Sequence, residues 1–337
     1  MAVSRTWYVS CSPRSPEKIG PELTELAKLD GVNWRMTDQD GRKVHQIAFA
    51  RFLKQIETFE GSISESDPAF SARDRLAPMQ TYGFAFVGSN GRLRITPAGH
   101  RLIAEERPQE LFLKQLLKWQ YPSWQHGGNP RTRHLYPPAG QTDIFPFIET
   151  LRVCRELGGI SKTEIAIFLL PVFSRADIPK AITQIGDFRT EREKFHGRER
   201  AEFVVEAHKQ HFRQVYAQEI ARGEVNTRET PTQTADQFLE KKIRNSRDVA
   251  DAAIRYFRAT GLFTLSADFH GLAISSVYRY EVDRILDELS LRPVEFYEDS
   301  DTPPRRGGSG SVSGMERLAS DQFARRFSGS TPKFYAG

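Results

Sequence analysis

The sequence predicts a mainly α-helical fold with small β-hairpin wings (α+β), in which a helix–hairpin–helix unit occurs twice. Three observations lead to this prediction. The length of 337 residues corresponds to about two domains of roughly 100–200 residues each. An Asn-Gly pair between two strand-like runs predicts a hairpin near Asn90. A second pair of strand-like runs, joined by a glycine-containing turn, recurs near Gly271.

The first unit begins with a short helix. We expect Ser71 to cap a helix that starts at Ala72 and stops at Gly83. Pro78 lies within this helix, so a break or kink is expected there. The first turn of this helix would carry Arg73, Asp74 and Arg75.

The hairpin and a closing helix follow directly. Residues 84–87 and 93–96 are strand-like, and the turn of residues 88–91 contains Asn-Gly. Thr96-Pro97 then begins another helix, because proline is favoured in the first helical turn. A helix, a two-stranded hairpin and a further helix in this order are typical of a winged-helix module, a helix-turn-helix variant that commonly binds duplex DNA.

The same order recurs downstream. A helix is expected over residues 245–259, a hairpin from residues 262–265 and 272–275, and a closing amphipathic helix over residues 280–289. We interpret the recurrence as an internal duplication. The predicted fold is therefore two tandem winged-helix modules.

The predicted boundaries follow from composition. The first module is expected over residues 1–125 and the second over residues 126–290, with a capping box at residues 161–164 beginning a supporting helix of the second. Residues 291–301 begin a linker. The Pro/Gly/Ser/Arg-rich residues 302–337 are expected to be disordered, because they cannot bury enough apolar surface to offset their ordering entropy.

Several classes of protein are disfavoured by composition. No apolar run approaches the length of about 18 residues that a membrane helix needs, and the N-terminus lacks the apolar core of a secretory signal, so a cytoplasmic protein without membrane contact is expected. Cys11 and Cys154 cannot form a disulfide framework and are expected to be ordinary buried thiols. The net charge of +5 favours a polyanionic partner only where the basic residues cluster.

The sequence shows no pattern of a catalytic residue or a metal site, and no cofactor is expected for this chain. Residues 240–242 (Glu-Lys-Lys) are interpreted as a solvated helix face, and the acidic residues 295–301 as a linker. His208 and His211 are expected to be a surface pair, since no third ligand has suitable spacing. Neither a catalytic triad nor a phosphate-binding Gly-rich loop with its Lys is found.

The two units share an Arg-Asp pair at the expected start of the helix before the hairpin. There, Arg can pair with guanine and Asp can accept from cytosine N4. The alternative is that each pair caps its helix, with the carboxylate at the positive end. The candidates for base-edge contacts are Arg73, Asp74, Arg75, Arg247 and Asp248. The candidates for phosphate or supporting contacts are Arg14, Lys18, Arg92, Arg94, Lys118, Arg244 and Asn245.

Long motifs resemble a known family. They include Trp7 to Ile19 (WYVSCSPRSPEKI), Phe70 to Met79 (FSARDRLAPM) and Arg247 to Ala252 (RDVADA). These segments resemble AlwI-type restriction endonucleases, and most closely the PleI, MlyI and BstNBI branch of Type IIS cleaving and nicking enzymes. The resemblance extends over about residues 5–301.

The resemblance implies a modular enzyme. It implies an N-terminal winged-helix region that reads a short asymmetric site, of GAGTC type, and a C-terminal Mg²⁺-dependent nuclease domain that cuts nearby. The implied partners are double-stranded DNA, a cognate DNA methyltransferase and, for this chain, a separate nuclease chain. The resemblance ends after Asp301, so recognition without cleavage is expected, from a frameshifted or truncated gene or from a genuine short variant.

Two alternatives remain open at the level of sequence. A transcriptional regulator or accessory DNA-binding subunit would use the same modules, but would be expected to dimerise on a near-palindromic site. A catalytically active short form would use carboxylates that follow none of the nuclease patterns considered above. Tandem non-identical modules in one chain instead predict a monomer on an asymmetric site.

Overall fold

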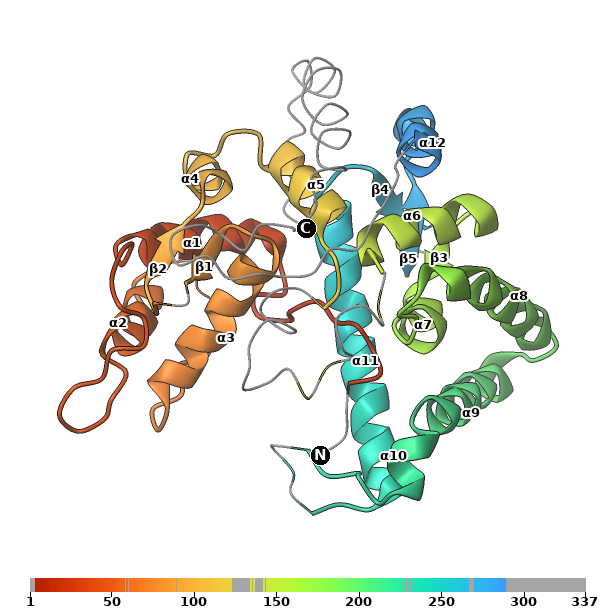
Figure 1. Ribbon diagram of the computed structural model, residues 1–337. Helices are drawn as coiled ribbons and strands as arrows, with labels where there is room; N and C mark the ends of the chain where they lie inside the picture. The colour runs from red at the N-terminus through yellow and green to blue at the C-terminus, as the bar shows by residue number, and fades with distance from the viewer. Residues whose placement is uncertain are drawn as a thin grey trace.

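The computed structural model describes residues 4–57, 59, 61–88, 90–122, 134, 136, 142, 144–227, 230, 232–266 and 270–288. Within these residues the protein is mostly helical and contains two small antiparallel sheets (Figure 1). The predicted class, mainly α with small β-hairpins, is therefore confirmed. The expected linker and the expected disordered tail lie outside the described residues.

The first unit contains α1 (Ile19–Ala27), α2 (Val44–Leu53) and α3 (Pro68–Thr81). Helix α3 starts earlier than predicted, because Asp67 rather than Ser71 is its N-cap and accepts a hydrogen bond of 2.9 Å from the Phe70 N–H. The proline at the first helical position suits this start, since its missing N–H would be unsatisfied there anyway. The helix also runs through Pro78 to Thr81, so the helix is not broken there, and the alternative expectation of a kink stays a prediction.

The hairpin after α3 agrees with the prediction. Strands β1 (Ala85–Val87) and β2 (Leu93–Ile95) pair antiparallel, and Gly91 in the turn has φ of 78°. Helix α4 (Pro97–Ile103) is capped as predicted by Thr96. The chain around Asn33 adds a third segment, which bridges the outer side of β2 at Arg92.

The second unit has a matching order of elements. Strands β4 (Phe263–Leu265) and β5 (Gly271–Ile274) form the predicted hairpin, and α12 (Arg279–Glu288) closes the unit. Strand β3 (Ile160–Ser161) pairs with the outer side of β5, so the strand order is β3-β5-β4. The predicted capping box is present: the Ser161 and Glu164 side chains each accept from the other's backbone N–H.

The helix before this hairpin is much longer than predicted. Helix α11 runs from Ala235 to Arg258 and begins with a capping box of Thr234 and Gln237. The predicted start at Asn245 is therefore wrong. The physical reason is that Phe238, Leu239 and Ile243, upstream of Asn245, are buried and continue the apolar face of the helix.

The remaining helices connect and extend the two units. Helices α5 and α6 lie between them in the chain, and α8, α9 and α10 are inserted within the second unit, between its supporting helix and α11 (Figure 1). Their bounds are α5 (Pro108–Lys118), α6 (Pro146–Leu157), α7 (Lys162–Glu164), α8 (Ile178–Glu193), α9 (Gly197–Val215) and α10 (Ala217–Ala221). A π-helical turn (Ile165–Leu169) follows α7, and short 3₁₀ turns occur at Pro16–Lys18, Arg175–Asp177 and Ser276–Tyr278.

One hydrophobic core continues through both units. Trp7 is fully buried within it, with ring centroids 6.1 Å from Trp119 and 6.4 Å from Phe257. Its indole N–H donates to the Leu169 carbonyl at 2.9 Å, and its backbone N–H donates to Leu170. The N-terminal segment is thus part of the core that joins the two units. No described helix is both long and apolar enough to cross a bilayer.

Candidate nucleic-acid interface

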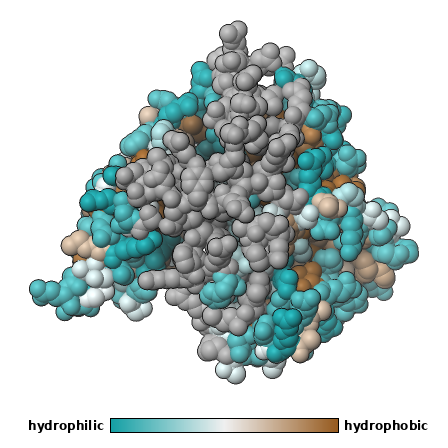
Figure 2. All heavy atoms as spheres, in the orientation of Figure 1, coloured by the Kyte–Doolittle hydropathy of each residue, from teal (hydrophilic) through white to brown (hydrophobic). Residues whose placement is uncertain are grey.

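Helix α11 presents a charged face along its length. Its 24 residues span about 36 Å. Because the apolar positions face the core, residues at three- and four-residue spacing on the other side are exposed. The exposed arginines on this face are Arg244, Arg247, Arg255 and Arg258. On the side of the molecule drawn in Figure 2, hydrophilic side chains predominate over the described surface.

Both Arg-Asp pairs lie on the surface, but neither lies in a first helical turn. Arg73 and Asp74 follow the first turn of α3, and Arg247 and Asp248 lie in the middle of α11. The expected positions at helix starts are therefore wrong, and the capping alternative is wrong for the same reason, since Asp67 and Thr234 are the caps.

Arg73 is held in place by its own unit. Its guanidinium donates to Gln46 Oε1 at 3.0 Å and to Asp67 Oδ2 at 3.3 Å, and its side chain remains 43% exposed. The guanidinium also lies 5.9 Å from the centre of the exposed Phe70 ring. The result is an arginine that is oriented and still accessible to a ligand.

Arg75 does not reach the surface. It is 7% exposed, and its Nη1 donates to Glu22 Oε1 at 2.6 Å in a buried ion pair between α3 and α1. The Phe59 ring lies 4.7 Å from its guanidinium carbon. Burial raises the pKa of Glu22 to about 7, although Arg75 opposes this shift. The predicted base contact of Arg75 is therefore corrected to a structural role, which the sequence hid because Arg75 directly follows two exposed residues.

The N-terminal segment lies between the helices that carry the two Arg-Asp pairs. Tyr256 of α11 donates through its hydroxyl to the Pro13 carbonyl at 2.9 Å, and Arg14 forms an exposed ion pair of 3.5 Å with Asp248. Burial raises the pKa of Cys11 to about 11, with further contributions from Asp248 and Asp74. Carboxylates of both α3 and α11 therefore contribute to the raised pKa of the Cys11 thiol.

The other predicted contact residues are spread over several elements. Arg92 is exposed directly before β2, and its Nη1 donates to the Gly31 carbonyl at 2.8 Å. Arg94 on β2, Lys118 at the end of α5 and Lys18 before α1 are half-buried. Arg244 and Asn245 are exposed on α11. The structure thus brings Arg14, Arg244, Asn245, Arg247 and Asp248 together on or beside α11, and places the other candidates elsewhere.

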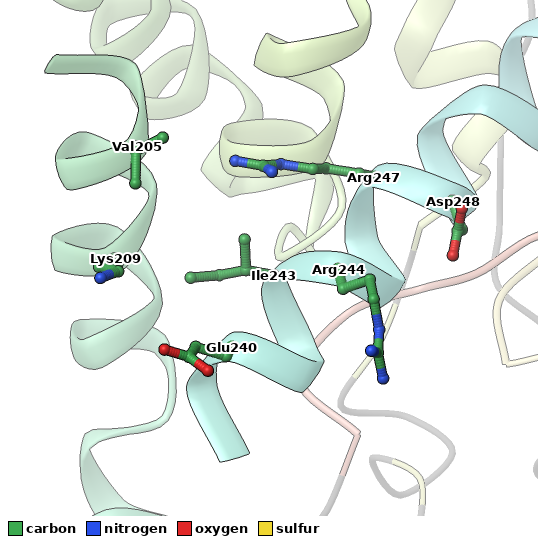
Figure 3. Close-up of a pocket in the computed structure, with 7 residues that line it drawn as sticks. All are labelled: Val205, Lys209, Glu240, Ile243, Arg244, Arg247 and Asp248. Carbon is green, nitrogen blue, oxygen red and sulfur yellow. The ribbon is translucent and has the colours of Figure 1, made fainter. Parts of the chain in front are cut away.

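A groove runs between α9 and the first half of α11 (Figure 3). It has a volume of about 450 Å³. Its lining residues are Val205, Lys209, Glu240, Ile243, Arg244, Arg247 and Asp248. Sequence reasoning missed Lys209, because α9 belongs to the inserted helices, for which the sequence offered no motif.

The prediction that His208 lies on the surface is wrong. It is 1% exposed and lies 3.1 Å from the Ser246 hydroxyl of α11. Since the Ser246 hydroxyl donates to the Ile243 carbonyl at 2.8 Å, it accepts from His208 Nε2–H. Burial and the charge of Arg247 lower the pKa of His208 to about 3, and burial lowers that of the half-buried His211 to about 4.

Acid is therefore expected to destabilise the protein through His208 and His211. A base with a lowered folded-state pKa contributes stability that is present above its unfolded pKa of about 6.5 and is lost as the pH falls towards 3. At pH 5 the expected loss is about 2 kcal/mol for each histidine. Urea unfolding of the wild type and of His208→Gln at pH 7.5 and pH 5 measures it. Equal pH dependence in the two proteins would contradict the assignment.

No group of three or more His, Cys, Asp or Glu side chains among the described residues is arranged to hold a metal ion. Glu240 is exposed, as expected for a helix face, but the neighbouring Lys241 donates to the Thr227 and Thr230 hydroxyls. Both cysteines are free thiols, with Cys154 buried and Cys11 half-buried.

Comparison with known proteins identifies a family. The sequence profile of the AlwI restriction endonuclease family matches residues 80–303. Among solved structures, the BpuJ1 endonuclease binding domain, in complex with pyrene- and phenanthrene-modified DNA, is similar with a TM-score of 0.46 and 10% identity. That similarity covers 81% of this chain and 80% of the other. No curated protein matches the chain. Because the family profile covers about two thirds of the sequence, including both hairpins and α11, the protein belongs to the AlwI restriction endonuclease family.

Proposed function

We propose that the described part of this protein recognises double-stranded DNA, as the recognition region of a Type IIS restriction or nicking endonuclease. The observation that carries the proposal is the repeated unit whose second copy presents the arginine-rich face of α11. Arginine is the side chain best suited to pair with both phosphates and guanine edges. Membership of a restriction endonuclease family supports the same conclusion.

We interpret both units as winged-helix modules. In each unit a helix leads into an antiparallel hairpin, and an earlier segment pairs with the outer side of the second hairpin strand. That earlier segment is the chain around Asn33 in the first unit and β3 in the second. The shared strand order supports an internal duplication, with α3 and α11 as the helices that precede the wings.

Two non-identical modules in one chain suit an asymmetric site, for which a GAGTC-type sequence is our proposal. The wider proposals that follow from the family are a cognate DNA methyltransferase, a Mg²⁺-dependent nuclease activity carried elsewhere or by a separate chain, and a cytoplasmic location. A regulator with the same modules would be expected to bind a near-palindromic site as a dimer.

Selection of bound duplexes from a random DNA pool in Mg²⁺ tests the proposal. The bound DNA is sequenced and also run on a denaturing gel, so that binding and cutting are measured together. We expect an enriched asymmetric site, bound by one protein molecule and recovered intact. Enrichment of a palindrome would favour the regulator, nicked DNA would show an active nuclease in this chain, and the absence of enrichment at low salt would exclude sequence recognition.

Arg73→Ala is expected to relax the preference at one position of the selected site. Arg73 is an accessible arginine whose guanidinium is already oriented by Gln46 and Asp67, and the loss of one base-reading arginine costs about 1–3 kcal/mol of binding free energy. The measurement is a competition among duplexes that differ at each position. Arg222→Ala, at an exposed arginine after α10, is the control. An unchanged preference in Arg73→Ala would remove Arg73 from the base-reading residues.

A further inference from the structure

The groove between α9 and α11 is created by the inserted helices. Among the described residues, the first unit has no helix between α2 and α3, whereas the second has α8, α9 and α10 between its supporting helix and α11. Buried contacts hold α9 beside the N-terminal half of α11, where Phe212 and Tyr216 pack with Phe238 in a second, smaller hydrophobic cluster. Helix α9 of the insertion is therefore held by packing along one side of the exposed face of α11.

The charge within this groove is predominantly positive. Lys209 comes from α9, and Arg244 and Arg247 come from α11. Within the part of the chain that the structure describes, none of these three cations forms an ion pair. Of the two carboxylates that line the groove, that of Asp248 is paired with Arg14, which leaves Glu240 as the remaining negative charge. Three unpaired cations around one groove indicate an anionic ligand.

The shape of the groove suits a ligand that is not only charged. Arg247 extends from α11 towards α9, where Val205 and Lys209 lie, while Arg244 points away from α9 (Figure 3). Apolar surface is contributed by Val205, which is 42% exposed, and by Ile243. A phosphate together with its sugar presents this combination of charge and apolar surface, whereas a free inorganic anion presents only the charge.

We propose that this groove binds the sugar–phosphate backbone of the DNA beside the recognised bases, with Lys209 and Arg247 on either side of the strand. The inference rests on the proposed function and deepens it. Arg247, predicted as a base contact, is here a phosphate contact, and Lys209 is a new contact residue. The inserted helices α8 to α10 would thus bind the DNA that flanks the recognised site. Arg244 extends the contact along α11.

The length of the arginine face agrees with a strand that follows α11. From Arg244 to Arg258 the helix rises by about 21 Å, and one strand of B-DNA passes about six phosphates over that distance along its axis. A strand that begins in the groove would thus pass Arg255 and Arg258 as well. The groove is one end of this path.

The test is the salt dependence of binding to the selected site, measured with a duplex that has long flanks and with one trimmed to the site. Lys209→Ala is compared with Lys194→Ala, at an exposed lysine after α8 whose ammonium pairs with Glu191. For the long duplex, Lys209→Ala is expected to reduce affinity several-fold for all sequences alike and to reduce the slope of log K against log salt by about 0.9. For the trimmed duplex it is expected to bind like the wild type, and Lys209→Arg should retain both affinity and slope.

The outcomes separate this inference from the function on which it rests. If the wild type selects a site but Lys209→Ala leaves the salt slope unchanged, the groove does not bind the backbone and the proposed function stands. A changed sequence preference in Lys209→Ala or Arg247→Ala would show base reading and would overturn the backbone assignment. If the wild type binds no DNA, both proposals fail. Thermal unfolding of each variant verifies that it is folded. The Lys209 side chain makes no hydrogen bond or ion pair in the described part of the chain, so Lys209→Ala should leave the fold intact.

Discussion

Arg189→Ala is expected to destabilise the protein by about 3 kcal/mol, because it leaves a buried carboxylate without its partner. Arg189 of α8 donates to both carboxylate oxygens of Glu164 at 2.8 Å, and to the carbonyls of Leu157 and Gly159. Glu164 is 1% exposed. Burial would raise the pKa of Glu164, but the hydrogen bonds from Arg189 and from the Ser161 N–H outweigh it and hold the pKa below its ordinary value.

The consequence reaches the proposed interface. Arg189 ties the inserted helices to the segment that carries β3 and the start of α7, so its loss should also loosen α9 and the groove beside α11. Urea unfolding measures the stability change, and DNA affinity at low temperature measures whether the groove still contributes to binding. The control is Arg198→Ala, whose 91% exposed side chain pairs with Glu202 on the surface and should cost less than about 0.5 kcal/mol. Equal effects of the two substitutions would refute the structural role of Arg189.

Arg75→Leu is expected to destabilise the protein by about 3–5 kcal/mol at pH 8. The substitution leaves Glu22 buried without its partner, and it removes the charge that opposes the rise in the pKa of Glu22. Since the pKa of Glu22 is already raised to about 7 from 4.5, its carboxyl favours stability below about pH 4.5, and that contribution is lost as the pH rises through 7. In the variant the pKa rises further, so the loss should be smaller at pH 5.5, where Glu22 is protonated, than at pH 8.

The double variant Glu22→Leu with Arg75→Leu tests the cause. Replacing both members of a buried ion pair by apolar groups is often neutral, so most of the lost stability should return and the added pH dependence should disappear. Where Arg75→Leu remains folded, its DNA affinity should equal that of the wild type, because Arg75 is too buried to touch DNA. A selective loss of affinity in folded Arg75→Leu would restore its predicted role as a base contact.

The local signals in the sequence predicted the local structure well. The hairpin before α4 follows from Asn90-Gly91, the start of α4 from Thr96-Pro97, and the supporting helix from the capping box of Ser161 and Glu164. Each of these features depends on residues within a few positions of one another. The chemistry of these turns and caps therefore needed no tertiary information.

The errors arose where an element or a side chain is determined by distant residues. The start of α11 was misplaced because its first half is stabilised by packing on α9, from an insertion without a recognisable motif. The cap of α3 is a different case, since the Asp67-Pro68 signal that begins the helix is local and was overlooked in favour of Ser71. Arg75 was expected to contact DNA from the first turn of a helix, and His208 was expected on the surface because no third metal ligand had suitable spacing. In the structure, Arg75 pairs with Glu22 and His208 bonds Ser246 in the interior.

By itself, the sequence determined the class of fold, the two hairpins with their closing helices, the resemblance to a restriction endonuclease family and the candidates for DNA contact. Only the tertiary structure decided which of those candidates reach solvent, that Arg14 and Asp248 meet, and that Lys209 lies across a groove from Arg247. The physical reason is the range of the interactions. Caps and turns act over a few residues, whereas burial and charge pairing act between residues far apart in the chain.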